Sequence, residues 1–373
     1  VVMVSAGFWP AVGGAERQAL ELSRALRERG VGVVVLTRRL GALPECSEVA
    51  GVPVRRLPVY GTGALDSLSF LIGALGWLLK HSDEYDAIHA HLAGSPALAA
   101  ALAGRFLGKP VLVKLGGGRG IGELALSSQT RLGRLKLRIL SLLKPRFLAV
   151  VPDLAGEALE YLGAADIEVV PNGVDVEHFK PVSAQEKLAL RARLGWPAGK
   201  IFLYTGRLSW EKRLSWFIKL WDEAAEGRDA TLILVGDGPE RFLLQGEATS
   251  SSGRIRILPV TNELAELYAA ADAFILPSIS EGLSNSLLEA MSSGLAVVAS
   301  AVGGNAETIE DGRTGLLFAR DDAAGAMSCV QRVLDDPELA ESLGAQARNE
   351  CETTYSLARV ARHCEELYSL EAI

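Results

Sequence analysis

The chain has 373 residues, of which 49% are hydrophobic, so two or three domains with sizeable cores are expected. A formal net charge of -7 gives no general attraction for nucleic acid, and no nucleic-acid partner is expected. Four scattered cysteines form neither a metal-binding pair nor a disulfide framework, and no apolar run reaches the ~18 residues of a membrane span. A reducing, cytoplasmic location is therefore the expectation.

Short β-branched runs alternate with longer helical patterns through the first half of the chain. The expected strands are 1–5, 31–37, 87–89, 111–115, 149–151 and 168–170. The helices expected around them are 15–29, 65–80, 96–107, 134–143 and 154–162. Continuous apolar strands separated by helices predict a parallel sheet that is covered on both faces.

The same alternation restarts near Lys200, which predicts a second α/β unit. Its expected strands are 201–206, 231–235, 255–258, 273–276 and 296–299, and its helices are 214–226, 240–246, 264–271, 285–293, 323–335 and 337–355. We place the two domains at 1–170 and 171–355, joined around the Asn-Gly pair of VVPNGVDVEHFKPVSAQEK. The last segment, 356–373, is expected to contribute a helix over 357–370 that packs back on the first domain.

Several glycines and basic residues follow strands, where open parallel sheets bind ligands. Gly13 and Gly14 precede a helix start, although an ordinary strand-to-helix turn explains them equally well. Arg207 and Lys212 follow the strand that ends at Gly206. A guanidinium and an ammonium suit a diphosphate, and a solvated basic loop is the alternative interpretation.

The stretch SEGLSNSLLEAMSSG carries Glu281 and Glu289 without a basic partner nearby. A salt-bridged surface helix would place bases three or four residues away. With a helix starting near Ser284 or Asn285, the two carboxylates could accept sugar hydroxyls, and the free N–H groups of 283–286 could donate to phosphate. The alternative is that Glu281 complements the helix dipole and that Glu289 is an exposed helical residue.

Taken together, these segments resemble the retaining glycosyltransferases of family 4, which have the GT-B fold. The resemblance covers nearly the whole chain and rests on the order of GGAERQALELSRALRERG, DAIHAH, VVPNGVD, GRLSWEKR, LVGDGP, LYAAADAFILPSISEGLSNSLLEAMSSG and SAVGGNAETIEDGRTGLL. It implies an α/β protein of two Rossmann-like, doubly wound parallel-sheet domains that face each other across a cleft. The first domain would bind the acceptor and the second the nucleotide-sugar donor.

The resemblance also implies roles for individual residues. Glu289 would bind the ribose hydroxyls and Glu281 those of the transferred sugar, while Arg207 and Lys212 would hold the diphosphate and stabilise it as it leaves. The expected catalytic residues are thus Arg207, Lys212 and Glu281. The expected donor-binding residues are Gly13, Gly14, Gly206, Val260, Gly282, Leu283, Ser284, Asn285, Ser286 and Glu289.

One position departs from the pattern of the family. Many members carry a histidine after the fourth strand of the first domain, where it contacts the transferred sugar. This chain reads VLVKLGGGRG, with Gly116 near the matching place and Lys114 two residues earlier, so the role of the histidine is not carried over. His91, Lys114 and Gly116 are the candidates for the acceptor or sugar side.

The reaction implied by the resemblance moves a sugar from a nucleoside diphosphate sugar to an acceptor hydroxyl with retention of configuration. No cofactor is expected, and no divalent metal is required when Arg207, Lys212 and a helix start hold the diphosphate. The nearest acidic pair, Asp321-Asp322, falls at a predicted helix start, which is consistent with this expectation. A uridine diphosphate sugar is slightly favoured over a guanosine one, and the acceptor is a glycan, a lipid-linked or a small molecule. The alternatives are a sugar-nucleotide epimerase and a non-catalytic nucleotide-sugar binding protein.

The segment 131–146 is basic and contains no acid, and its leucines recur at helical spacing. Such a segment can lie on an anionic membrane surface, which would place the protein peripherally at the inner face of a membrane. The interpretation that we favour is a core-packed helix with a solvated basic face.

Overall fold

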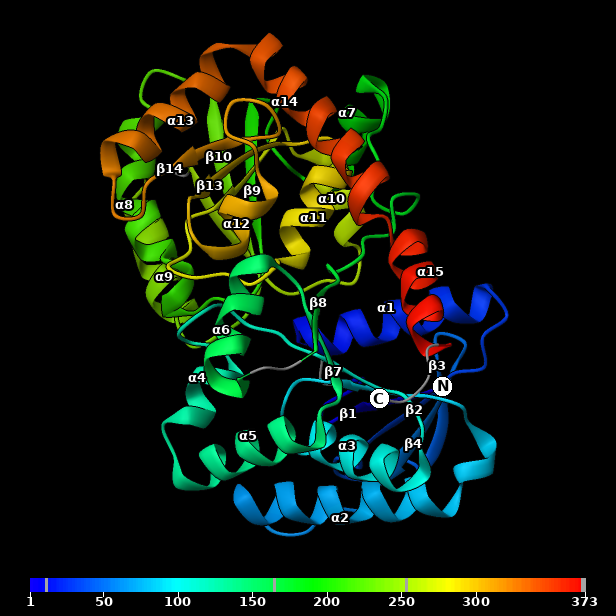
Figure 1. Ribbon diagram of the computed structural model, residues 1–373. Coiled ribbons are helices and arrows are strands. Elements are labelled where there is room, and N and C mark those ends of the chain that lie inside the picture. The colour runs from blue at the N-terminus through cyan, green and yellow to red at the C-terminus, as the bar shows by residue number, and fades with distance from the viewer. Residues whose placement is uncertain (11–12, 164–165, 252–253, 370–373) are drawn as a thin grey trace. The chain divides into compact units, whose positions relative to one another are not determined.

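A computed structural model describes residues 1–10, 13–163, 166–251 and 254–369 (Figure 1). Contacts between residues divide the chain into two compact units. Unit 1 comprises Val1–Gly173 together with the C-terminal segment that begins at Leu357, and unit 2 comprises Val174–Ser356.

Unit 1 is built on an eight-stranded sheet in the order β3-β4-β2-β1-β5-β6-β7-β8. Its strands are β1 (Val2–Ser5), β2 (Val34–Arg38), β3 (Cys46–Val49), β4 (Val52–Leu57), β5 (Ile88–His91), β6 (Val111–Lys114), β7 (Arg146–Ala149) and β8 (Ile167–Val169). All neighbouring pairs are parallel except β3 and β4. Because the chain runs outward from β1 in one direction and then from β5 in the other, the topological switch point lies between β1 and β5.

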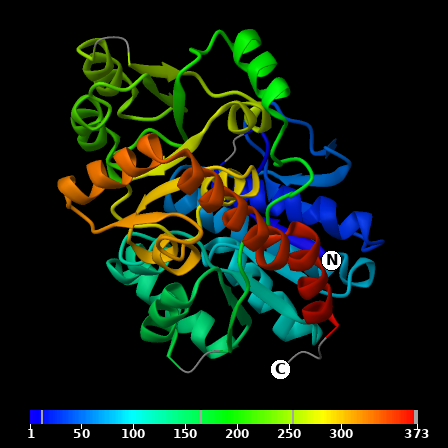
Figure 2. The ribbon, with the colours of Figure 1, turned by 90° about the horizontal axis from the view of Figure 1, so that it is seen from above.

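Helices cover both faces of this sheet. They are α1 (Gly14–Glu28), α2 (Ala64–Lys80), α3 (Ser95–Leu107), α4 (Glu123–Ser128), α5 (Arg131–Leu143), α6 (Pro152–Leu162) and α15 (Leu357–Tyr368). Helices α1 and α15 pack against each other, as Figures 1 and 2 show, whereas α2 packs on α3. The C-terminal helix is therefore part of unit 1, and the predicted helix end at Leu370 lies outside the described residues.

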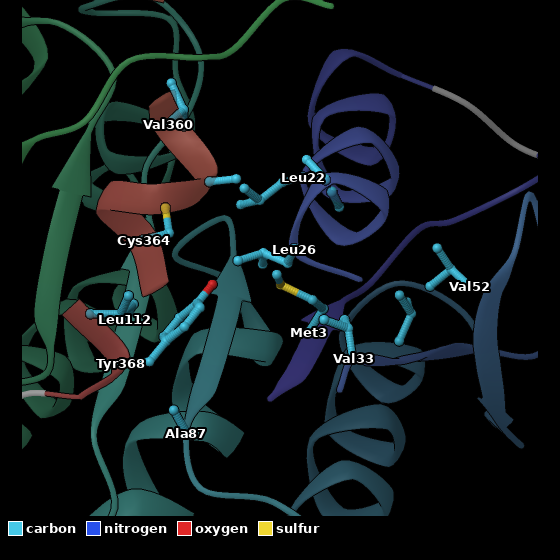
Figure 3. Packing of buried hydrophobic residues seen from close by; sticks show 14 of the residues in the cluster. Met3, Leu22, Leu26, Val33, Val52, Ala87, Leu112, Val360, Cys364 and Tyr368 are labelled. Carbon is cyan, nitrogen blue, oxygen red and sulfur yellow. The ribbon is translucent and has the colours of Figure 1, made fainter. Parts of the chain in front are cut away.

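The core beneath α1 and α15 joins segments from both ends of the chain. Leu22 and Leu26 of α1 lie on the same apolar face, spaced so that both meet the sheet. Val360 and Cys364 of α15 repeat this spacing, and both belong to the same buried cluster as Leu22, Leu26 and Met3 (Figure 3). Burial of this apolar surface, at roughly 25 cal/mol per Å², fixes α15 on unit 1.

Unit 2 contains a six-stranded, fully parallel sheet in the order β11-β10-β9-β12-β13-β14. Its strands are β9 (Lys200–Thr205), β10 (Ala230–Val235), β11 (Ile255–Leu258), β12 (Ala273–Leu276), β13 (Ala296–Ser300) and β14 (Leu316–Phe318). Its helices are α7 (Ala184–Leu194), α8 (Leu214–Ala224), α9 (Arg241–Thr249), α10 (Leu264–Ala270), α11 (Asn285–Ser292), α12 (Gly303–Thr308), α13 (Ala323–Asp335) and α14 (Pro337–Glu350). The switch point of this sheet lies between β9 and β12.

The prediction of two doubly wound parallel sheets is confirmed, and its errors lie mainly in short or polar elements. Strand β3 is largely exposed and has the unpatterned sequence CSEV, so only its pairing with β4 identifies it as a strand. Helix α7 begins in the last residues of the predicted joint and continues to Leu194, and a capping box of Ser183 and Glu186 starts it. The last predicted helix of unit 2 ends at Glu350, and a π-helical turn follows over Cys351–Tyr355.

Candidate functional site

The candidate site of unit 2 lies at its switch point, where the loops after β9 and β12 meet. Strands β9 and β12 are neighbours, with Phe202 opposite Ala273. Both loops leave the carboxyl ends of their strands, and the Ile279 N–H donates to the Glu211 carbonyl oxygen across them at 2.8 Å. Residues about seventy positions apart in the sequence are therefore brought to one edge of the sheet.

The centre of the site is an ion pair between Lys212 and Glu281. Lys212 lies in a short 3-10 turn, η2 (Trp210–Lys212), and its Nζ is 2.6 Å from Glu281 Oε1. Ser278 Oγ donates to the same carboxylate oxygen at 2.6 Å. Glu281 is only 8% exposed, so its charge is held by both donors rather than by water.

Arg207 presents an exposed guanidinium that has no hydrogen-bond or ion-pair partner among the residues that the structure describes. Its carbonyl oxygen accepts a hydrogen bond of 2.9 Å from the buried hydroxyl of Tyr204. Burial raises the pKa of Tyr204 well above its usual value, and the nearby Glu281 adds to the shift, so the phenol remains a neutral donor. The backbone at Arg207 is thus fixed while the side chain is left available to a ligand.

The loop that carries Arg207 rests on the GDGP turn after β10. The Leu208 N–H donates to the Asp237 carbonyl oxygen at 2.8 Å, and a Cβ atom at Gly236 would lie 1.9 Å from the Gly206 carbonyl oxygen. A Cβ at Gly238 would similarly meet the Leu208 carbonyl oxygen at 2.3 Å. The two glycines therefore permit a close backbone approach between the two loops.

Glu289 is buried in the second turn of α11 and does not face solvent as an ordinary helical acid would. It is 4% exposed, and its Oε2 accepts a hydrogen bond of 2.8 Å from the Tyr268 hydroxyl. The same hydroxyl contacts Thr205 Oγ1 at the end of β9. The alternative of an exposed helical glutamate is therefore wrong, because the carboxylate is oriented by a buried phenol.

The start of α11 lies between the two glutamates. Ser284 is its N-cap, with Oγ accepting from the Leu287 N–H at 3.4 Å and lying 3.0 Å from Ser286 Oγ. Gly282 and Leu283 are buried, whereas Ser284, Asn285 and Ser286 are half-buried. The helix therefore begins where the sequence placed it.

The turn that carries Glu281 is packed directly against the start of α12. The Gly304 N–H donates to the Glu281 carbonyl oxygen at 3.0 Å. A Cβ atom at Gly304 would lie 1.5 Å from the Gly282 carbonyl oxygen, a distance at which the backbone must move. The Gly-Gly pair after β13 thus positions the Glu281 turn.

We expect Gly304→Ala to destabilise the protein by about 2–3 kcal/mol, because the added methyl group displaces the turn at Gly282. The matched control is Gly246→Ala in α9, where a Cβ atom meets nothing within 4 Å and a helical alanine is slightly stabilising. Urea unfolding of both variants measures the difference, and equal stabilities would contradict the packing argument.

Val260 lies apart from this group. It is exposed in the loop after β11, which is the edge strand of the sheet, with β10 between it and β9. No hydrogen bond or ion pair among the described residues links it to Lys212 or Glu281. Its expected role in binding the donor remains a prediction.

The candidate residues of unit 1 divide into surface and buried groups. Gly13 is the exposed N-cap of α1, its N–H donating to Glu16 Oε2 at 3.0 Å, and Gly14 begins that helix. Gly116 is half-buried in the loop after β6. His91 is the last residue of β5, which pairs with β1 across the switch point of this sheet.

His91 and Lys114 are both buried and occupy paired positions on β5 and β6. His91 stacks on His89, with ring centroids 4.8 Å apart, and His89 Nδ1 lies 2.7 Å from the Tyr368 hydroxyl. Burial lowers the pKa of His91 to about 3, with a smaller contribution from Lys114, so the imidazole is neutral at pH 7. Burial also lowers the pKa of Lys114 to about 8.

Glu123, at the start of α4, is a half-buried acid whose environment the sequence did not reveal. Its Oε1 is inaccessible to water and has no hydrogen-bond partner within the described part of the chain. Burial raises the pKa of its carboxyl to about 7, and Lys136 and the backbone N–H groups of Ala93 and Gly116 oppose the shift only in part. No periodic or charge signal in GIGELALSS distinguishes this glutamate from an exposed one.

The raised pKa of Glu123 predicts a pH-dependent stability. The folded chain binds this proton more tightly than the unfolded chain, whose glutamate has the ordinary value of 4.5, so its contribution is fully present below about pH 4.5 and lost as the pH rises through 7. Between pH 5 and pH 8 the melting temperature of Glu123→Gln should therefore rise relative to that of the parent. The control is Glu28→Gln, an exposed acid of α1, and parallel profiles for the parent and Glu123→Gln would refute the assignment.

Other members of the site were also missed as functional residues. Ser278 precedes Glu281 by three residues, and Tyr268 lies in an apolar segment where it resembles a core residue. Gly303 and Gly304 were recognised only as part of a motif. Their contribution becomes visible when β12 and β13 bring the two loops together.

The described residues contain no group of three or more histidines, cysteines, aspartates or glutamates that could hold a metal ion. Asp322 is the N-cap of α13, accepting from the Gly325 N–H at 2.9 Å, as the predicted helix start implied. Asp321 pairs with Arg213. Within the same residues, no helix has the length and apolar character needed to cross a bilayer.

The two doubly wound parallel sheets, with charged residues gathered at the switch point of the second, have the GT-B architecture. Residues 12–178 match the family described as Glycosyltransferase Family 4, and residues 199–336 match Glycosyl transferases group 1. The chain belongs to glycosyltransferase family 4.

Individual relatives agree with this assignment. The chain is 30% identical over 346 residues to 2-deoxystreptamine glucosyltransferase of Streptomyces kanamyceticus, covering 86% of this chain and 89% of the relative. It is 33% identical over 229 residues to sulfoquinovosyl transferase of Arabidopsis thaliana, covering 60% of this chain but 44% of that protein. The fold matches the crystal structure of HepE from Anabaena in complex with UDP-glucose, with a TM-score of 0.79 and 20% sequence identity. The match covers 99% of this chain and 100% of HepE.

Proposed function

We propose that this glycosyltransferase moves a sugar from a nucleoside diphosphate sugar to an acceptor hydroxyl, with retention of the anomeric configuration and without a divalent metal. The observation that carries the proposal is the ion pair of Lys212 and Glu281 at the switch point of unit 2, beside a loop that leaves Arg207 exposed. A cation and an acid side by side suit a phosphate and the sugar attached to it.

The leaving diphosphate is the group on which negative charge grows in the transition state. Arg207 offers a planar fork of donors and Lys212 a compact charge, while the start of α11, near Ser286, adds a partial positive charge. Donors that are already in position when this charge develops lower the barrier without reorganisation. These groups would supply the stabilisation that a metal ion provides in other sites.

The two glutamates would bind hydroxyl groups of the donor. A carboxylate has about four acceptor positions, so Glu281 can accept sugar hydroxyls while it retains Lys212 and Ser278. Glu289, oriented by Tyr268, would accept the ribose hydroxyls. With both acids engaged in this way neither acts as a nucleophile, and the acceptor attacks from the front face while a leaving phosphate oxygen takes its proton.

The donor and acceptor are proposed from the relatives. HepE was crystallised with UDP-glucose, which supports a uridine diphosphate sugar. The name of the 2-deoxystreptamine glucosyltransferase supports a small-molecule acceptor, and a glycan or a lipid-linked acceptor is the alternative.

Thermal-shift measurements with uridine, guanosine and adenosine diphosphates and their sugars test the donor. The proposal expects stabilisation by at least one of them, release of nucleoside diphosphate together with sugar transfer, and a rate that is unchanged by EDTA. NMR of the product would show retained anomeric configuration. Conversion of the sugar nucleotide without transfer would indicate an epimerase, and binding without turnover would indicate a binding protein.

Peripheral membrane contact through 131–146 remains a prediction. Leu137 and Leu140 of α5 are buried, as expected for a core-packed helix. Leu132, Leu135 and Leu142 are exposed among basic residues, which is the pattern that an interfacial helix would need.

A further inference from the structure

Unit 1 contains a recess of about 320 Å³ at the end of its sheet opposite to His91 and Lys114. Its lining comes from the start of β6 and β7, the ends of α3 and α5, and Leu367 of α15. The volume falls at the lower end of the range of small-ligand pockets. Because the recess lies at the amino ends of the strands, it is separate from the switch point of this sheet.

The lining carries four basic residues and no acidic one: Arg105, Lys109, Lys144 and Arg146. The carboxyl ends of α3 and α5 each contribute a negative charge of about one half, and Asp166 pairs with Arg146 Nε at 2.7 Å. These negative groups leave a surplus of about two positive charges. Complementing the helix dipoles therefore does not explain the whole cluster.

Two of the four cations have no partner among the residues that the structure describes. Lys109 donates to the carbonyl oxygens of Ser82 and Tyr85, so its ammonium group is already engaged within the fold. Arg105 and Lys144 form no side-chain hydrogen bond or ion pair with any described residue. Lys144 caps α5 in the left-handed conformation, at φ 48°, which fixes its backbone at the mouth of the recess.

The mouth of the recess is flanked in sequence by exposed apolar side chains. Phe106, which follows Arg105, is 76% exposed, and Leu142, which precedes the lining residue Leu143, is 75% exposed. Cations with adjacent exposed apolar groups suit a phosphate that is attached to an apolar body, as in a lipid headgroup.

We propose that this recess is a second binding site, separate from the donor site, that binds a phosphate group through Arg105 and Lys144. The phosphate is either free in solution or the headgroup of an anionic lipid, and the chemistry of recognition is the same in both cases: charge-assisted hydrogen bonds from a guanidinium and an ammonium. The inference does not depend on the transferase reaction.

Isothermal titration calorimetry of the full chain with inorganic phosphate at low ionic strength tests the site. We expect Arg105→Gln/Lys144→Asn to bind phosphate at least tenfold more weakly than the parent, since two charged donors are lost. Asparagine is chosen at 144 because it tolerates the left-handed conformation. The matched control, Arg359→Gln/Arg362→Gln, removes the same charge from exposed positions of α15 outside both the recess and 131–146, and should bind as the parent does.

Vesicle flotation with phosphatidylcholine, alone or mixed with phosphatidic acid, separates the two sources. Binding to phosphatidic acid that is lost in Arg105→Gln/Lys144→Asn, kept in the control and weakened by Phe106→Ser/Leu142→Ser assigns the site to a lipid headgroup. Phosphate binding that follows the same pattern without vesicle binding assigns it to a soluble phosphate. If neither probe distinguishes the two double variants, and their melting temperatures match that of the parent, the proposed site is refuted.

Discussion

Arg207→Ala should lower the rate of sugar transfer by about a hundredfold to a thousandfold, because one donor that stabilises the leaving diphosphate is lost. The free energy of unfolding should change by no more than ~0.5 kcal/mol, since the side chain is exposed and has no partner in the described part of the chain. Steady-state kinetics and urea unfolding, measured on the same preparation, separate the two effects.

Two further variants sharpen this test. Arg207→Lys keeps the charge but loses the planar fork, so it should recover only part of the rate. Arg332→Ala removes an exposed arginine from α13 of the same unit and should leave both rate and stability unchanged. A turnover of Arg207→Ala close to that of the parent would remove this residue from the proposed diphosphate site.

Lys212→Met should lower turnover by a similar factor and, unlike Arg207→Ala, should also destabilise the fold by about 3 kcal/mol. The loss of stability arises because Glu281 is buried and would keep its charge with only Ser278 as a donor. The double variant Lys212→Met/Glu281→Gln removes that buried charge and should recover most of the stability. It should not recover turnover, because both proposed ligands of the donor are absent.

Comparing the stability and the turnover of these variants shows whether the pair of Lys212 and Glu281 acts in catalysis or only stabilises the fold. Recovery of both properties in the double variant would show that the pair of Lys212 and Glu281 is purely structural. Lys187→Met serves as the control, since Lys187 pairs with Asp272 of unit 2 at 3.4 Å in another part of the sheet. It should lose stability without a change in the catalytic rate.

The sequence predicted the continuous apolar strands well, because a strand that is buried on both faces has a run of apolar residues that can be recognised locally. Strands β11 and β12 have the predicted bounds, and helix α13 does as well. The edge strands β3 and β14, strand β4 and the six-residue helices α4 and α12 were missed, since their stability comes from neighbours rather than from their own pattern. Strand β7 was predicted at 149–151 and lies at Arg146–Ala149.

The candidate site was predicted unevenly for a related reason. Glu281 and Glu289 could be singled out because acids in an apolar segment without nearby bases are unusual. Tyr268 and Gly304 could not be singled out. A tyrosine in an apolar segment looks like any other core residue. The need for glycine at 304 is apparent only from the backbone atom that a Cβ would contact. Burial of Glu123 is likewise a property of its surroundings and not of its segment.

By itself, therefore, the sequence determined two α/β units, the loops that carry Arg207 and Lys212, and the family to which the chain belongs. Only the tertiary structure decided that Lys212 pairs with Glu281, because these residues are 69 positions apart and meet through the adjacency of β9 and β12. The order of strands depends on packing over the whole sheet, whereas a sequence pattern shows only the periodicity of a single helix or strand. The adjacency of β9 and β12 could therefore not be read from the sequence.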